Sequence, residues 1–394
     1  MADAQYRKEL EMRIASLAVA ALGLAVALGL AVALAPAVTR AEPIAEISAA
    51  IGVPLSLDAH KIKLGGALKS PEAWMAYKKR FIAEQGRVID TANDHVSHSE
   101  GQGYAMLLAV AANDRATFDR LWGWTRANLM VRNDELVAWR FDPQHRPAVG
   151  DMNNASDGDL LIAWALAEAA EYWDDLPLRM AARRIAVELS RKVVLFKTKM
   201  GALLLPAVAG FNASDRSDGP VVNLSYYVFP ALARLDSVAP EVDWAGLTQT
   251  GLDLLEASRP TPQTLPADWI ALEGWRARPA EGFAPEFAYN AVRIPLYLAW
   301  AGVGERAHYA PFLAWAQRAK EAPPIVDVAS GKDVGQFGGG GIASIAALVS
   351  CVVDGGKLPA DFAAPRANED YYPATLHLLA LLAAQMRYSS CLAN

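Results

Sequence analysis

Two acidic residues stand where apolar helical patterns begin, and each is placed to do acid–base chemistry. Glu100 lies in S-H-S-E-G-Q-G-Y-A-M-L-L, and Asp157 lies in A-S-D-G-D-L-L-I-A-W. Burial against an apolar helix raises a carboxyl pKa and keeps the proton available for donation. The helix dipole lowers the pKa of a first-turn acid, and ordinary N-capping would also place an acid there. The two residues are therefore candidates for a catalytic pair, with capping as the alternative.

The residues around Glu100 predict a helix start that other parts of the protein approach closely. Ser99 can cap the helix, and Gly101 and Gly103 leave room for a bulky partner against the backbone. A carboxyl that is open on one side and apolar on the other is suited to proton donation.

Other kinds of site are not indicated. His95 and His98 are three residues apart, but no third ligand has a fitting spacing for a metal. The four glycines at 338–341 lack the Gly-Lys-Ser/Thr ending of a phosphate loop. We therefore expect neither a metal nor a cofactor.

The composition indicates a chain with a large core and limits its partners. Of 394 residues, 53% are hydrophobic and 20% are charged. The net charge is −6 and basic runs are absent, which argues against nucleic acid as a partner. The eleven Trp and twelve Tyr residues are compatible with carbohydrate binding, because aromatic rings stack on the apolar faces of sugars.

The N-terminal residues have the pattern of an export signal. Three basic residues precede an uncharged apolar run from 14 to 38, and Thr39-Arg40-Ala41 offers small residues for cleavage. The run is also long enough for an uncleaved membrane anchor. The predicted organisation is a signal peptide or anchor over 1–41, a linker over 42–69 and a folded domain over 70–394. We expect a periplasmic or secreted protein, in which Cys351 and Cys391 could pair.

Helical patterns follow one another through the predicted domain, and strand patterns are few. Helices are expected over 71–84, 103–112, 115–129, 159–173, 178–194, 225–235, 244–257, 291–301, 311–319, 342–352 and 374–386. Short hairpin strands are expected at 135–139 and 202–205. Alternating short and long connections suggest helical hairpins in a closed ring, with the long loops 133–157, 198–223, 259–289 and 321–341 on one face.

Several motifs in order along the chain resemble glycoside hydrolase family 8. The two strings that hold Glu100 and Asp157 are followed by N-L-S-Y-Y at 223–227, Y-N-A-V-R-I-P at 289–295 and Y-Y-P-A at 371–374. The resemblance extends over about 69–388, and it is greatest to periplasmic endo-1,4-β-glucanases that accompany bacterial cellulose synthesis. It implies an all-α (α/α)6 barrel with short β-hairpin pieces in the loops on one face, and hydrolysis with inversion.

The resemblance also assigns roles to residues of this chain. Glu100 matches the proton donor, and Asp157 matches an aspartate that is either the second catalytic carboxylate or the group holding the distorted sugar. The expected substrate-binding residues are Trp139, Tyr226, Asn290, Arg293 and Tyr372. The expected partners are a β-1,4-glucan chain and the cellulose synthase machinery, and the expected oligomeric state is a monomer.

Asn290 departs from the family pattern, because many family cellulases have an aspartate there as general base. An amide has no ionisable group with which to take a proton from water. Either Asp157 is the base, a loop acid such as Glu281 or Glu286 replaces it, or the enzyme is weak. If Asp157 is the base, its carboxyl should lie within or just below roughly 6.5–9.5 Å of Glu100, and N290D should be tolerated. A chitosanase branch of the family also has Asn here, so chitosan hydrolysis and a catalytically weak glucan-binding barrel are the alternatives.

Overall fold

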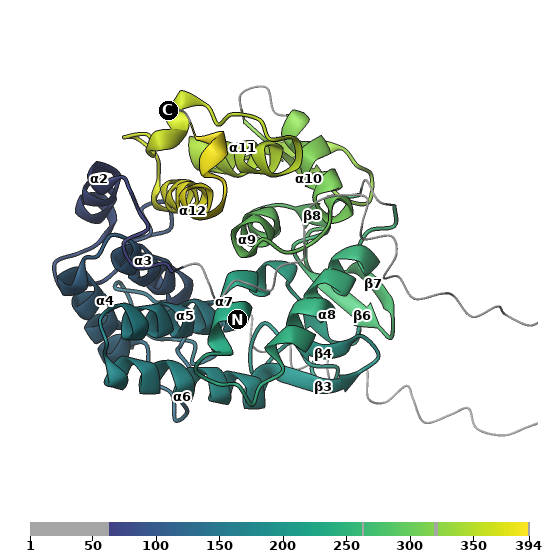
Figure 1. Ribbon diagram of the computed structural model, residues 1–394. Helices are drawn as coiled ribbons and strands as arrows, with labels where there is room; N and C mark the ends of the chain where they lie inside the picture. The colour runs from purple at the N-terminus through teal and green to yellow at the C-terminus, as the bar shows by residue number, and fades with distance from the viewer. Residues whose placement is uncertain (1–62, 262–263, 319–321, 393–394) are drawn as a thin grey trace, which may run out of the picture. The chain divides into compact units, whose positions relative to one another are not determined.

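A computed structural model of the protein describes residues 63–261, 264–318 and 322–392 (Figure 1). The predicted signal peptide or anchor over 1–41 lies outside these residues, as does most of the predicted linker. The first described residues already pack on the helices, since Leu64 and Leu68 are buried and the Leu68 N–H donates to the Ala111 carbonyl at 3.0 Å. Packed chain therefore begins before residue 70.

Every helix expected from the apolar periodicity is present, with ends shifted by a few residues. The α-helices are α2 (Pro71–Phe81), α3 (Ser99–Ala111), α4 (Arg115–Asn128), α5 (Ser156–Tyr172), α6 (Leu176–Val193), α7 (Phe229–Leu235), α8 (Trp244–Ala257), α9 (Arg293–Ala301), α10 (Arg306–Gln317), α11 (Gly340–Asp354) and α12 (Tyr371–Arg387). The described part of the chain also has the short 3-10 helices η3 (Leu224–Tyr226), η4 (Ala360–Ala363) and η5 (Ser389–Cys391).

The helices of the described chain form two concentric layers of a ring (Figure 1). Helices α3, α5, α7, α9 and α12 lie inside, and α12 closes the ring because it packs against both α9 and α3. Inner helices are buried on nearly all sides, as α5 illustrates: every residue from 156 to 170 is buried. Within the described residues, no helix is both long enough and apolar enough to cross a membrane.

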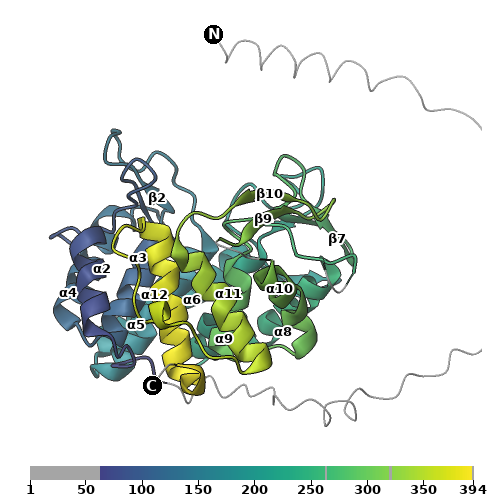
Figure 2. The same cartoon turned by 90° about the horizontal axis from the view of Figure 1, so that it is seen from above.

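Short antiparallel strands lie in the long connections, several of them at one end of the ring (Figure 2). The pairs and sheets are β1 (Ser97–His98) with β2 (Arg140–Phe141), β3 (Val194–Thr198) with β4 (Gly201–Leu204), β5 (Val221–Val222) with β6 (Ile270–Glu273) and β7 (Arg276–Pro279), and β8 (Glu286–Phe287) with β9 (Pro324–Asp327) and β10 (Asp333–Gln336). The expected strand at 202–205 is confirmed as β4.

The strand expected at 135–139 is wrong, because the strand of this loop is β2 at Arg140–Phe141. Before β2 the backbone forms an isolated antiparallel bridge between Ala138 and Asn154, and at Val137 it is held by a side chain. The Val137 N–H donates to the Asp159 carboxylate at 2.8 Å, so this donor is not available to a strand partner.

The start of α3 is as crowded as its glycines predict. A Cβ added at Gly101 would lie 2.5 Å from Tyr371 Oη, and one added at Gly103 would lie 2.5 Å from Leu161 Cβ. The expectation that Ser99 caps α3 is wrong. Ser99 is the first residue of the helix, its Oγ is buried, and this atom has no hydrogen-bond partner in the described part of the chain.

A disulfide joins α11 to the short helix η5, which follows α12. Cys351 of α11 and Cys391 of η5 form this bond, and both residues are buried. The Leu358 N–H donates to the Cys391 carbonyl at 2.8 Å, which ties the same two segments together again.

Candidate active site

The two acidic residues singled out in the sequence meet because the first turns of α3 and α5 touch. Glu100 and Asp157 are each the second residue of their helix. The contact depends on Gly158: a Cβ at this position would lie 2.7 Å from Ser99 Cβ and 2.9 Å from the Glu100 nitrogen. Gly158 therefore lets the two helix starts come together and brings their carboxylates to one place.

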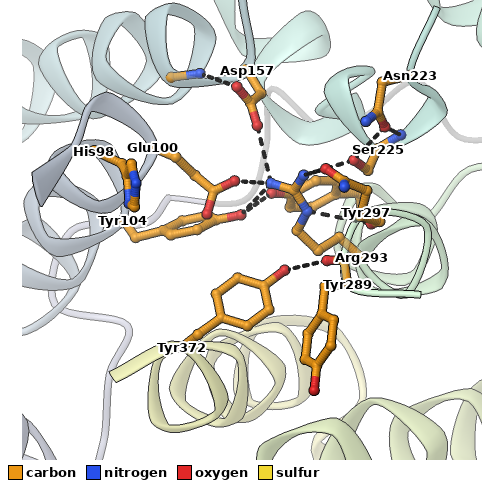
Figure 3. Close-up of polar contacts among 12 residues, drawn as sticks. His98, Glu100, Tyr104, Asp157, Asn223, Ser225, Tyr289, Arg293, Tyr297 and Tyr372 are labelled. Atoms are coloured by element: carbon orange, nitrogen blue, oxygen red, sulfur yellow. Dashed lines mark hydrogen bonds and ion pairs between the residues drawn. The ribbon is translucent and has the colours of Figure 1, made fainter. Parts of the chain in front are cut away.

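Arg293, in the first turn of α9, joins both carboxylates (Figure 3). Its Nη1 donates a hydrogen bond to Glu100 Oε2 and forms an ion pair with Asp157 Oδ2 at 3.0 Å. Its Nη2 donates to Ser225 Oγ at 2.8 Å and to Asn290 Oδ1 at 3.0 Å. The side chain of Arg293 is only 2% exposed, so this buried cation is held by acceptors from four segments of the chain.

The separation of the two carboxylates falls below the range that an acid and a base with a water between them require. Both acids contact the same nitrogen of Arg293, so their near oxygens are closer than roughly 6.5 Å. The expectation allowed a separation just below this range. In this arrangement Asp157 has no space for an attacking water between itself and Glu100.

The surroundings of Glu100 keep its proton at neutral pH. Burial raises the pKa of its carboxyl to about 8, and the charge of Asp157 together with its hydrogen bond to Glu100 adds to this rise. The nearby Arg293 acts in the opposite direction but does not cancel the effect of burial. With 21% of its side chain exposed, Glu100 is a protonated acid that a ligand can reach.

A cleft of about 830 Å³ opens over this pair. Its lining includes all seven residues proposed from the sequence: Glu100, Trp139, Asp157, Tyr226, Asn290, Arg293 and Tyr372. Residues that sequence reasoning did not propose also line it, among them Asp90, His98, Tyr289, Arg366, Glu369 and Asp370. His98 and Tyr289 belong to motifs quoted above, but the other four come from segments without a distinctive pattern.

Aromatic side chains form part of the cleft wall. Trp139 lies parallel to the His98 ring at a centroid distance of 5.8 Å, and its Nε1 donates to Asp151 at 2.8 Å. The Arg293 guanidinium lies 5.7 Å from the ring centre of Tyr226. Such fixed rings are suited to stacking on sugar units.

The loop acids considered as replacement bases do not reach the cleft. Glu281 is exposed and pairs with Arg278 at 3.4 Å, and Glu286 lies in β8. Neither residue is among those that line the cleft. The geometry therefore gives no support to Glu281 or Glu286 as the base.

Asn290 and Ser225 take part in the site through Arg293. Asn290 does not cap α9, because the helix begins at Arg293 and Val292 is its N-cap. Ser225 lies in the N-L-S-Y-Y motif, but its role depends on a contact with α9 that a sequence does not reveal. The Asn223 side chain holds Ser225 by accepting from its Oγ at 2.7 Å.

A protonated carboxyl and a second carboxylate in a long aromatic cleft are the equipment for cutting a bond between sugars. The site and the helical ring that carries it define a glycoside hydrolase.

The family follows from comparison with known proteins. The model of the family described as "Glycosyl hydrolases family 8" matches residues 61–386, and the chain belongs to this family. It is 35% identical over 318 residues to a probable endoglucanase of Novacetimonas hansenii, a match that covers 79% of this chain and 90% of the relative.

Two solved structures share the fold, which is an (α/α)6 barrel. One is endoglucanase Cel10 of Klebsiella pneumoniae, with 37% identity, 80% of this chain and 99% of that chain covered, and a TM-score of 0.73. The other is endo-β-1,4-glucanase CMCax of Acetobacter xylinum, with 34% identity, 81% and 99% covered, and a TM-score of 0.73. The fold expected from the resemblance is thus confirmed.

Proposed function

We propose that this protein is an endo-1,4-β-glucanase that hydrolyses cellulose-type β-1,4-glucan. The observation that carries the proposal is the protonated Glu100 in a cleft whose wall includes Trp139 and Tyr226. The names of the related proteins, endoglucanase and endo-β-1,4-glucanase, support the same substrate class.

In the proposed reaction, Glu100 gives its proton to the oxygen that leaves the scissile bond. The ring that loses this bond gains positive charge, and Asp157 beside it stabilises that charge. A water molecule attacks the opposite face of the ring and loses a proton to a carboxylate. The products are two shorter glucans, and the configuration at the reacting carbon is inverted.

The environment of Asp157 supports inversion over a covalent intermediate. Asp157 is 1% exposed, and its carboxylate accepts from the Gly158 N–H at 2.8 Å and pairs with Arg293 at 3.0 Å. A carboxylate held in this way is poorly placed to attack a sugar carbon. Its proximity to Glu100 likewise favours the role of holding the distorted sugar over that of general base.

The proton of the attacking water goes to an acid other than Glu100. The remaining acidic residues that line the cleft in the described chain are Asp90, Asp157, Glu369 and Asp370. Exchange of the true base for its amide should abolish hydrolysis, and added azide should then restore cleavage, because it attacks the sugar carbon in place of water and gives a glycosyl azide. Rescue of D157N by azide would return Asp157 to the role of base.

The proposed function is tested by hydrolysis of carboxymethylcellulose, measured as new reducing ends. Proton NMR of the first products of a soluble cello-oligosaccharide reports the stereochemistry, and we expect the α-anomer to appear first. Absence of new reducing ends would contradict the function, and initial release of the β-anomer would contradict inversion alone.

Chitosan is a second candidate substrate, because acidic groups dominate the cleft. Five acids line it, whereas Arg293 and Arg366 are its only arginines among the described residues. Carboxylates would attract the ammonium groups of glucosamine units. The same reducing-end assay with chitosan decides between the two substrates. A glucan-binding barrel without activity would release no reducing ends from carboxymethylcellulose or from chitosan.

We further propose that the protein is an exported monomer that assists bacterial cellulose synthesis. The buried disulfide between Cys351 and Cys391 supports an oxidising compartment. The export pattern over 1–41 agrees with this location. Mass spectrometry of the protein from a periplasmic fraction would show cleavage near residue 41, and size-exclusion chromatography with light scattering would test the monomer.

A further inference from the structure

Asp268 is a buried carboxylate just behind the cleft, and its hydrogen bonds converge on one turn. It lies two residues before β6 and does not line the cleft. Its Oδ1 accepts from the N–H groups of Ala288 at 2.9 Å and Ala291 at 2.8 Å. Its Oδ2 accepts from the backbone N–H of Asn290 at 3.2 Å and from the side-chain Nδ2 of the same residue at 3.3 Å.

These contacts fix the direction of the Asn290 amide. The Nδ2 end meets Asp268, which can only accept while it is ionised, and the Oδ1 end meets the guanidinium of Arg293, which can only donate. A flipped amide would oppose oxygen to carboxylate and N–H to guanidinium. Charges at both ends therefore select one orientation.

The orientation of Asn290 in turn supports Arg293. The Nη2 of Arg293 donates to Asn290 Oδ1 at 3.0 Å, while its Nη1 holds Glu100 and Asp157. Nε and the backbone N–H of Arg293 also donate to the Asn290 carbonyl, at 3.4 and 3.1 Å. Asn290 thus supports one side of the guanidinium, while the other side contacts the two cleft acids.

We propose that Asp268 is a positioning residue of the active site, which acts through the Asn290 amide on Arg293 and so on Glu100 and Asp157. The proposal deepens the function above and rests on it. Asp268 touches no substrate, and its effect on catalysis is the placement of the cation between the two acids.

The same geometry explains why an amide suits position 290 in this chain. An aspartate there would direct an oxygen at Asp268 Oδ2 across the 3.3 Å now spanned by a hydrogen bond. Two carboxylates at this distance repel each other. The sequence alone suggested that N290D would be tolerated, but Asp268 predicts that this exchange by itself is harmful.

A double-mutant cycle over positions 268 and 290 tests the proposal. D268N keeps the shape but turns an N–H group toward Asn290 Nδ2, and N290D turns an oxygen toward Asp268. We expect each single exchange to lower kcat/KM on soluble cello-oligosaccharide roughly ten- to a hundredfold, mainly through kcat, because misplaced catalytic groups slow the reaction to this extent. The double variant restores a donor opposite an acceptor and should recover about tenfold over either single variant.

A second readout does not require hydrolysis. Carbon-13 NMR of the labelled side-chain carboxyls follows the titration of Glu100, whose pKa Arg293 lowers. In D268N the looser Arg293 should shift the Glu100 midpoint upward, and in the double variant the midpoint should return toward the wild-type value. If the wild-type protein cuts no glycan, this titration still tests the link, so the two proposals can fail separately.

The other groups that face Glu100 do not obscure this titration. Asp157 contributes a charge from α5, and its contact with Arg293 is part of the same cluster. The remaining facing groups are phenols with pKa values raised by burial, which stay neutral through the range: Tyr104, Tyr226, Tyr297, Tyr371 and Tyr372.

Two results would overturn the proposal. One is a D268N protein with wild-type kcat/KM and an unchanged Glu100 midpoint. The other is a double variant no better than either single variant in both readouts. Asp268 also accepts from three backbone N–H groups, so D268N could fail to fold. In that case N290D decides alone, and wild-type kcat/KM in N290D would contradict the proposal that Asp268 positions Arg293 through Asn290.

Discussion

Among single residues, Glu100 has the most direct consequence for activity. Its pKa of about 8 keeps it protonated at neutral pH, and Glu100→Gln removes the proton while preserving shape. We expect kcat on an unactivated glucan to fall about 10²–10⁴-fold, the usual contribution of a general acid. Reducing-end assays measure the loss, and circular dichroism checks the fold. Near-normal turnover of this variant would remove Glu100 from the role of acid.

A second single-residue prediction concerns Trp139 and substrate binding. Its ring lines the cleft, so Trp139→Ala should raise KM for cello-oligosaccharides about two- to tenfold, as expected for loss of one aromatic stacking contact. The melting temperature of the Trp139→Ala protein should differ little from that of the wild type. Trp275, which is 63% exposed and lies outside the cleft, gives a matched control. A large loss of stability in Trp139→Ala with unchanged KM would make it a structural residue.

The site residues that could be proposed from the sequence are those that have a reactive or charged side chain and also lie in a recognisable motif. Glu100 and Arg293 fall in this class, and both line the cleft. Asp268 contacts the turn before α9, and Ser225 contacts Arg293 at the start of that helix. No local pattern predicts such contacts. The expected cap at Ser99 failed for a related reason, because the approach of Gly158 decides the surroundings of that hydroxyl.

Between elements, the decisive contact is the meeting of α3 and α5 at Gly158. A methyl group at this position would overlap Ser99 and the Glu100 nitrogen, so Gly158→Ala should push the helix starts apart. We expect an activity loss of roughly a hundredfold, since small displacements of catalytic groups have such effects. Kinetics and thermal unfolding of purified protein measure both consequences.

Gly123→Ala provides the control for this prediction. Gly123 lies within α4, and a Cβ there meets nothing within 4 Å. Alanine should stabilise this helix by about 0.4–1 kcal/mol and leave activity unchanged. Equal behaviour of the two variants would show that α3 and α5 tolerate separation.

Helices could be predicted from the sequence because apolar periodicity over ten or more residues is a local property. The strands were harder to predict, since each of them is five residues or fewer and depends on a distant partner. The loop before β2 shows the limit: its residues have a strand pattern, but Asp159 takes the hydrogen bond of Val137. The order of the helical hairpins could be predicted from the sequence, whereas the paths of the loops that connect them could not.

For the whole molecule, closing the ring concentrates charge in a buried place. Glu100, Asp157 and Arg293 come from α3, α5 and α9, and Tyr372 comes from α12. The fold supplies the apolar surroundings that raise the pKa of Glu100. The burial that keeps this acid protonated for catalysis also opposes its ionisation when the pH rises. This opposition should be visible as a pH dependence of stability.

The sign of that dependence follows from the groups with shifted pKa values. Burial raises the pKa of Glu100 to about 8 and that of Asp159 to about 7, whereas both carboxyls ionise near pH 4 in an unfolded chain. Their stabilising contribution is complete below about pH 4 and is lost as pH rises through 7 and 8. Burial lowers the pKa of His98, His308 and His377, so their effect is confined to pH below about 6.5.

Between pH 6.5 and 8 the two carboxyls therefore act without opposition from the histidines. We expect the free energy of unfolding to fall by about 1 kcal/mol per pH unit in this window, the order of magnitude for one group that is protonated only in the folded state. Urea unfolding at pH 6.5, 7.25 and 8 measures the slope. Glu100→Gln has no carboxyl at position 100 to ionise, so its slope should be smaller, and most clearly so above pH 7, where more than half of Asp159 has titrated. A wild-type stability that stays constant or rises across this window would show that Glu100 and Asp159 ionise in the fold as they do in water.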